Sequence, residues 1–157
     1  MVWPTKNDYL EIYRTAHNNA ADLLREAELL FDHKCFARAY ALAFTALEEI
    51  SKSQFAADVF TGLCKEDDFN EFYRNHRSKI ERVAWAHLDA NSYPHNLKWV
   101  GPDIDDLERI NPQEPDFGKR LNALYIGVDF KNRTIIKPEE QITEKDAKEM
   151  MRLVEVV

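Results

Sequence analysis

The stretch Ala37–Leu47, which reads ARAYALAFTAL, decides the fold. It contains one charged residue, Arg38, and five alanines, so a helix built from it has no polar side. A helix that is apolar all round is enclosed by other elements, and alanines allow neighbouring helices to approach closely. We therefore predict that this stretch belongs to the central helix of a tight helical bundle.

The helical pattern continues on both sides of this stretch. Apolar residues recur every three or four positions from Phe36 to Gly62, where a glycine can end a helix in the left-handed conformation. The same spacing runs from Thr5 to about Phe31 and is interrupted at His33–Lys34. Because the interruption is short and both apolar sides need a partner, we predict a long antiparallel helix hairpin around Lys34.

Shorter elements are predicted after Gly62. A third helix begins at Asp67–Asp68, whose carboxylates suit a helix N-terminus, and extends through Leu88. Four prolines in the segment 89–118 indicate a long connection, with a short helical turn at 104–109. The remaining predicted elements are a helix at about 117–125, a short β-hairpin near 126–136 and a last helix that opens with the capping motif Thr143–Asp146.

Length and composition predict a single all-α domain that spans residues 1–157. Hydrophobic residues make up 45% of the 157 and charged residues 31%, with only 4 glycines and 6 prolines, which is typical of helical globular proteins. A disordered chain or a turn-rich sheet protein would have a different balance. The net charge of -7 argues against nucleic-acid binding over the whole surface and confines such contact to a local basic region.

The chain is expected to be cytoplasmic and to have no membrane contact. Cys35 and Cys64 form no CxxC motif, which favours two reduced thiols in a reducing compartment. The segment Met1–Asp8 has no basic region followed by an apolar run, and charges interrupt every later apolar stretch before it reaches the length of a membrane span.

An otherwise apolar segment of the central helix is interrupted by three charged residues: Glu48, Glu49 and Lys52. Spacings of three and four place Lys52 beside a carboxylate on one side of the helix. One interpretation is an exposed salt bridge of little energetic value. The other is a polar site inside the bundle, because a buried charge needs a partner.

The third predicted helix carries a local basic patch. Between Arg74 and Arg82 there are four lysine and arginine residues against one glutamate, a net charge of +3 in an acidic protein. His76 and Lys79, three positions apart, share the side that faces the core. The patch is either a solvated helix face or a site in which His76 transfers protons beside phosphate-binding cations.

No metal and no cofactor are predicted. The sequence contains no Glu-x-x-His pair of the di-iron type, no His-Glu-x-x-His motif and no second half for His33-x-Cys35. Phosphate-loop NTPase and α/β-hydrolase motifs are absent as well.

Glu49, Lys52, His76 and Lys79 are predicted to lie in one connected site. The turn at Gly62 returns the third helix antiparallel to the central helix. Lys52 and His76 lie roughly the same number of residues from that turn, so at about 1.5 Å rise per residue they reach matching height.

Three segments resemble the AbiV-like (abortive infection) family of the HEPN superfamily. They are the end of the alanine-rich helix, Ala46–Lys52; the stretch FYRNHRSK from Phe72 to Lys79; and the late segment that starts at Arg120–Tyr125 and runs to Pro138 and Thr143. They occur in the family's order and cover most of the chain from about residue 36 onward.

The resemblance implies a helical, homodimeric HEPN-like bundle that acts in phage defence. HEPN proteins are commonly metal-independent endoribonucleases with an Arg-x(4–6)-His motif, or non-catalytic modules that bind RNA, nucleotides or a partner protein. Arg82 and His87 fit that spacing, but Val83 replaces the polar residue that usually follows the arginine. The resemblance therefore implies either a nuclease or a non-catalytic binding module.

The sequence therefore indicates two alternative functions. In the first, the protein binds or cleaves RNA: His76 acts on a 2′-hydroxyl or leaving group, Lys79 with Arg82 stabilises phosphate charge, and Glu49 with Lys52 orients the site. In the second, it is a non-catalytic dimeric helical module that binds a partner protein or a small charged ligand.

Overall fold

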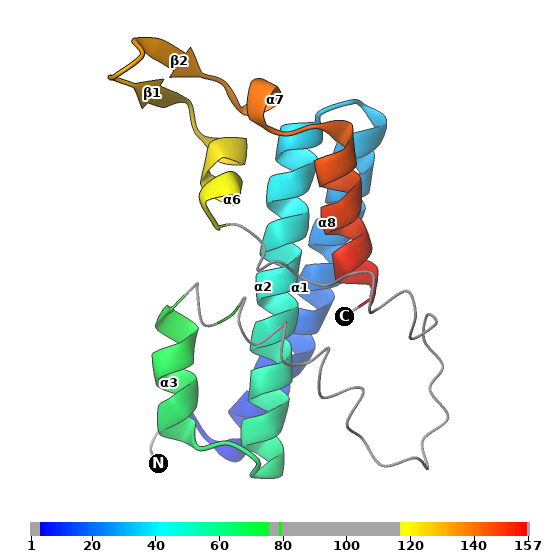
Figure 1. Cartoon of the computed structure of the whole chain (residues 1–157). Coiled ribbons are helices and arrows are strands. Elements are labelled where there is room, and N and C mark those ends of the chain that lie inside the picture. The colour runs from blue at the N-terminus through cyan, green and yellow to red at the C-terminus, as the bar shows by residue number, and fades with distance from the viewer. Residues whose placement is uncertain (1–3, 76–78, 80–116, 157) are drawn as a thin grey trace, which may run out of the picture.

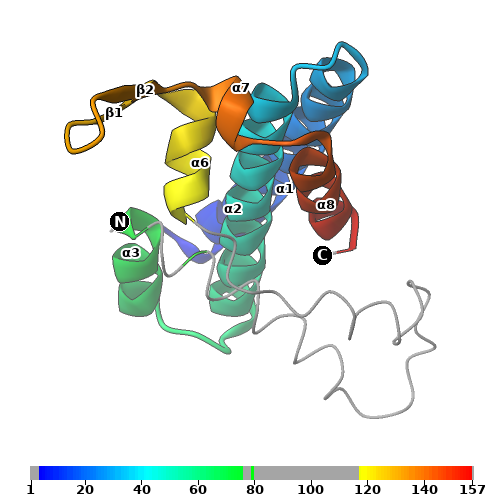
Figure 2. The same cartoon turned by 45° about the horizontal axis from the view of Figure 1, so that its top comes forward.

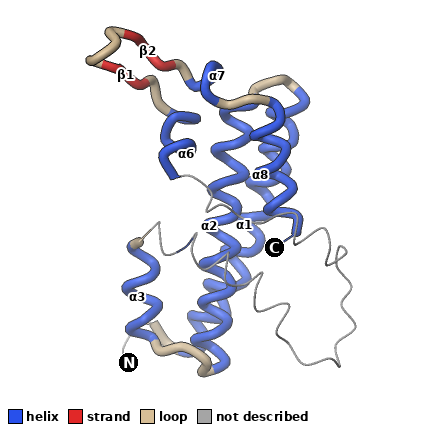
Figure 3. Tube along the Cα trace, in the orientation of Figure 1, coloured by secondary structure: helices blue, strands red, loops and turns tan. Residues whose placement is uncertain are grey.

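The computed structural model describes residues 4–75, 79 and 117–156. Within these residues the protein is all-α apart from one small sheet (Figures 1 and 3). The elements in chain order are α1 (Lys6–Asp32), α2 (Phe36–Thr61), α3 (Glu66–Arg74), α6 (Phe117–Leu124), β1 (Gly127–Asp129), β2 (Thr134–Ile136), α7 (Pro138–Gln141) and α8 (Glu144–Val156). None of the helices in these ranges combines the length and the apolar character that crossing a membrane requires.

The two long helices α1 and α2 form the predicted antiparallel hairpin (Figure 1). Lys34 adopts a positive φ of 61° in the turn between them. Gly62 ends α2 with a φ of 86°, the left-handed conformation that favours glycine. The predicted boundaries of both helices are therefore confirmed to within one or two residues.

α2 is the central helix, and most of its buried residues lie in two hydrophobic clusters. The first, called here the α8 core, packs the alanine-rich half of α2 against α1, α6 and α8. The second, the α3 core, lies at the other end of α2. Its buried members are Tyr9, Phe55, Ala56, Val59, Phe69 and Phe72. Edge-on ring contacts hold the α3 core together, with Phe55 and Phe72 centroids 4.5 Å apart.

The third helix is shorter than predicted. α3 ends at Arg74, and Asn75 takes an extended conformation with φ −112° and ψ 108°. Asparagine is a poor helix residue because its side chain competes for backbone hydrogen bonds. The carbonyl of Asn75 accepts a hydrogen bond from the backbone N–H of Lys79 at 3.4 Å. The rest of the predicted third helix, and the predicted connection with its turn at 104–109, fall outside the residues that the structure describes.

The late elements follow the prediction closely. β1 and β2 form an antiparallel hairpin in which Val128 pairs with Ile135. Asp146 accepts hydrogen bonds from the backbone N–H and the hydroxyl of Thr143, and thereby caps α8. The short helix α7 was not predicted; Pro138 occupies its first turn, where a missing N–H costs nothing. Figure 2 shows that α6 and the hairpin lie on one side of α2, away from α8.

Replacing Ala43 with leucine should lower the free energy of unfolding by about 1–3 kcal/mol, because Ala43 is fully buried in the α8 core and a larger side chain forces the helices apart. Ala21→Leu, at an exposed position of α1, is the control and should change the free energy of unfolding by less than about 0.5 kcal/mol. Urea unfolding measures both. Equal midpoints for the two variants would show that Ala43 is not in a close helix contact.

Candidate functional site

Five charged residues gather on one side of the middle of α2: Glu48, Glu49, Lys52, Lys79 and Arg120, called here the charge cluster. α2 supplies the first three, α6 supplies Arg120, and Lys79 follows α3. In both Figures 1 and 2, α3 and α6 lie on the same side of α2. Along α2 the charges fall between Leu47 of the α8 core and Phe55 of the α3 core.

The deepest pair in the charge cluster joins Glu48 to Arg120. The carboxylate and the guanidinium are 3.3 Å apart, with exposed fractions of 5% and 15% for the two side chains. The guanidinium carbon of Arg120 also lies 5.4 Å from the centroid of the Phe44 ring. An aromatic face and a carboxylate together compensate for removing the arginine from water.

Glu49 and Lys52 form a second ion pair one turn apart on α2. Each side chain is only 16% exposed. The exposed salt bridge, one of the two interpretations of the sequence, is therefore wrong for this pair. The polar site inside the bundle describes its position better.

Lys79 is held against α2 by its backbone. The hydroxyl of Ser51, a fully buried residue, donates a hydrogen bond to the carbonyl of Lys79 at 2.6 Å. The Lys79 ammonium lies 5.3 Å from the centroid of the Tyr73 ring, and the Lys52 ammonium lies 5.4 Å from the same ring. Two cations thus share one aromatic ring, which itself is half exposed.

The surroundings lower the pKa of Lys79 below its ordinary value. Burial of the ammonium is the main cause, and repulsion from Lys52 and Arg120 acts in the same direction. Attraction to Glu48 and Glu49 opposes it. With three cations against two carboxylates, the charge cluster has an excess of positive charge that an anion would relieve.

Three of the five residues predicted to carry the chemistry are brought together: Glu49, Lys52 and Lys79. His76 and Arg82, with His87 of the Arg-x(4–6)-His spacing, fall outside the described part of the chain. The placement of His76 in this site therefore stays a prediction.

Arg120 and Tyr73 belong to the site, but the reasoning from sequence did not assign them to it. The sequence does contain a signal for Arg120. It stands three positions before Ala123, so the two share one side of α6, and Ala123 is buried in the α8 core. A lone arginine on the apolar side of a short helix indicates a buried ion pair. The sequence contains no such signal for Tyr73, because the neighbouring residues do not indicate which cations will lie against its ring.

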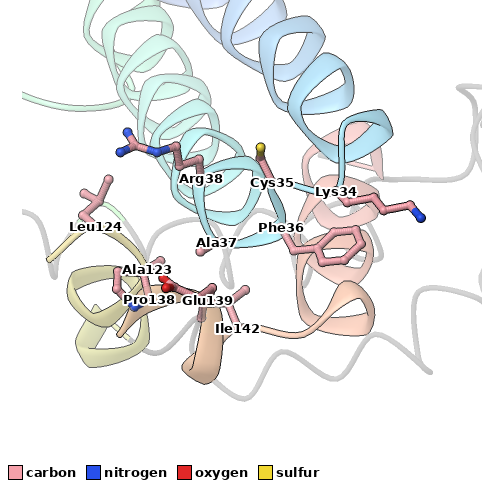
Figure 4. A pocket seen from close by; sticks show the side chains of 10 residues that line it. All are labelled: Lys34, Cys35, Phe36, Ala37, Arg38, Ala123, Leu124, Pro138, Glu139 and Ile142. Atoms are coloured by element: carbon pink, nitrogen blue, oxygen red, sulfur yellow. The ribbon is translucent and has the colours of Figure 1, made fainter. Parts of the chain in front are cut away.

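A cavity of about 370 Å³ lies at the start of α2, where α2 meets α6 and α7 (Figure 4). Its walls mix charged and apolar side chains, among them Lys34, Arg38, Glu139, Phe36 and Ile142. Along α2 it is about three to four turns away from the charge cluster, and it shares none of the cluster's residues. Among the residues that the structure describes, no group of three or more His, Cys, Asp or Glu side chains could hold a metal ion.

Comparison with known families gives one match. The sequence model of the HEPN_AbiV family, described as AbiV, matches residues 8–157. No curated protein and no solved structure shows significant similarity to the chain.

The lowered pKa of Lys79 predicts how stability changes with pH. The folded protein releases this proton at a lower pH than the unfolded chain, so the unfolded state binds more protons between the folded pKa and the ordinary value of 10.5. Stability from this group therefore rises with pH across that window. The free energy of unfolding of the wild type, minus that of Lys79→Met, should increase as the pH is raised toward 10.5.

Urea unfolding at several alkaline pH values measures this difference. Lys145→Met is the control, because Lys145 lies exposed on α8 beside Glu149. The free energy of unfolding of the wild type minus that of Lys145→Met should not change with pH. A difference for Lys79 that stays flat or falls with pH would mean that its ammonium is not desolvated.

Proposed function

Since the chain belongs to the AbiV family of HEPN proteins, we propose that it is an abortive-infection protein directed at RNA, that its charge cluster binds the RNA backbone, and that it works as a homodimer. The arrangement around Tyr73 carries the proposal. The ammonium groups of Lys52 and Lys79 converge on one ring although they repel each other. A phosphate between two such groups removes the repulsion and gains charge-assisted hydrogen bonds.

In this proposal RNA approaches the lysines from the side of Tyr73. This ring is 51% exposed, while the lysines behind it are largely enclosed. An exposed aromatic beside cations is the combination that single-stranded RNA binds, because bases stack on the ring while phosphates contact the cations. The excess positive charge is local, as an acidic protein requires.

Metal-independent cleavage of RNA is the catalytic form of this proposal. His76 takes the proton of a 2′-hydroxyl, and the 2′-oxygen attacks the neighbouring phosphorus. The bond from phosphorus to the 5′-oxygen breaks, which leaves a 2′,3′-cyclic phosphate and a 5′-hydroxyl that takes its proton from water. Lys79 and Arg82 stabilise the charge that builds up on the phosphate oxygens, and Glu49 holds Lys52 in place.

One observation favours the second function, a non-catalytic dimeric module. The Glu48–Arg120 pair is nearly enclosed, and both of its partners come from the same chain. Buried ion pairs of this kind can specify how helices pack without taking part in a reaction. In that case the charge cluster fixes the position of α6 on α2, and a partner protein or small charged ligand is bound elsewhere.

Binding of a fluorescent single-stranded RNA oligonucleotide, followed by anisotropy, tests the RNA proposal. Lys52→Gln and Lys79→Gln should each weaken binding by about tenfold or more and reduce the salt dependence by about one counterion. Lys145→Gln, which removes an exposed lysine of α8, is the matched control and should change affinity by less than about twofold. Wild type that binds no RNA at low salt would overturn the proposal and favour the second function.

Incubation with total RNA then separates binding from cleavage. The wild type should cut RNA in the presence of a chelator, and His76→Ala should not. If the wild type binds RNA but does not cut it, RNA binding is supported and the nuclease activity is refuted.

A further inference from the structure

Ser51 makes a buried hydrogen bond that joins two distant parts of the chain. The residue lies in the middle of α2 and is fully buried. Its hydroxyl donates to the backbone carbonyl of Lys79 at 2.6 Å, although 28 positions separate the two residues in the sequence. A buried carbonyl needs a hydrogen-bond donor, so this bond attaches the backbone of Lys79 to the central helix.

The backbone of Lys79 is bound at both of its polar groups. Its carbonyl accepts the bond from Ser51, and its N–H donates to the carbonyl of Asn75 at 3.4 Å. The bond from Ser51 is the shorter and therefore the stronger of the two. The side chain of Lys79 thus starts from a fixed point beside α2, from which its ammonium reaches a position 5.3 Å from the centroid of the Tyr73 ring.

The two lysines that lie against Tyr73 are held in different ways. Lys52 is held through its side chain, by the ion pair with Glu49. Lys79 is held through its backbone, by Ser51. The two ammonium groups repel each other, so bringing them close together costs free energy. A ligand binds more tightly when the fold has already brought such groups together, because less of the binding free energy is then used for that purpose.

We propose that Ser51 is a positioning residue of the RNA site, whose hydroxyl holds Lys79 where one phosphate can contact both lysines. This role rests on the proposed function, in which the charge cluster binds the RNA backbone. Ser51 is fully buried and does not touch RNA itself. It acts through Lys79, so loss of its hydroxyl affects RNA binding in the same way as loss of the Lys79 ammonium.

Anisotropy of the fluorescent single-stranded RNA oligonucleotide, with variants of the full chain, tests this role. Ser51→Ala should weaken binding by about fivefold or more and reduce the salt dependence by about one counterion, as Lys79→Gln does. In the double variant the two effects should not add, because both act on the same ammonium. Ser53→Ala is the matched control, because Ser53 is buried on α2 as well but lies on another side of the helix. It should change the affinity by less than about twofold.

The titration of the Lys79 ammonium, followed by NMR, tests the positioning without RNA. In the wild type its pKa should lie below the ordinary value, because the ammonium is buried and close to Lys52. Ser51→Ala should return the pKa toward 10.5, since a released side chain regains water, and Ser53→Ala should not change it. Ser51→Cys, which keeps a weaker donor at the same position, should lie between the wild type and Ser51→Ala in both measurements.

Three results would overturn the proposal, each with a different meaning. If Lys79→Gln weakens RNA binding but Ser51→Ala changes neither binding nor the pKa of Lys79, the role of Ser51 alone is refuted. If Ser51→Ala and Ser53→Ala weaken binding equally, without any change in salt dependence, the two serines only support the helix. A wild type that binds no RNA refutes the proposed function together with this role. The titration of Lys79 needs no RNA and therefore separates that result from a failure of the hydrogen bond itself.

Discussion

A carboxylate buried halfway along α2 is the constraint on which the rest of the structure depends. Glu48 stands between two hydrophobic clusters, where an unpaired charge would be costly. Arg120 compensates it from α6, which must therefore lie against the middle of α2. The position of α6 in turn places the hairpin that follows it and one wall of the cavity at the start of α2. The ion pair thus acts together with the α8 core, which packs α6 and α8 against the central helix.

The same constraint gives the protein an electrostatic centre suited to anions. Among the described residues, pairing of Glu48 with Arg120 and of Glu49 with Lys52 leaves Lys79 as additional positive charge, desolvated and beside a second lysine. Such a group gains much from a phosphate, because the interaction is stronger where water is excluded. The half-exposed ring of Tyr73 lies against both Lys52 and Lys79. Stability and proposed function therefore draw on one set of charges.

Local sequence patterns predicted the helices well, because the information for them is local. The alanine-rich stretch favours a helix, while Gly62 and Thr143 each mark a helix boundary through their own backbone or side-chain hydrogen bonds. The end of α3 was predicted wrongly, since the apolar spacing continues past Asn75, whereas α3 ends at Arg74 and Asn75 is extended. Lys79 nevertheless contacts α2, because Ser51 binds its backbone carbonyl. The role of Arg120 could not be predicted with its partner, because Glu48 lies far away in the sequence.

A double-mutant cycle between Glu48 and Arg120 tests most directly whether the charge cluster is one desolvated network. The free energies of unfolding of Glu48→Gln, Arg120→Gln and the double variant give the coupling energy of the pair. We expect a coupling energy of about 2–3 kcal/mol, because removing one partner leaves the other charge buried. The exposed pair Lys145–Glu149 on α8 serves as the reference and should give less than about 1 kcal/mol. A coupling for Glu48–Arg120 no larger than this reference would contradict the account.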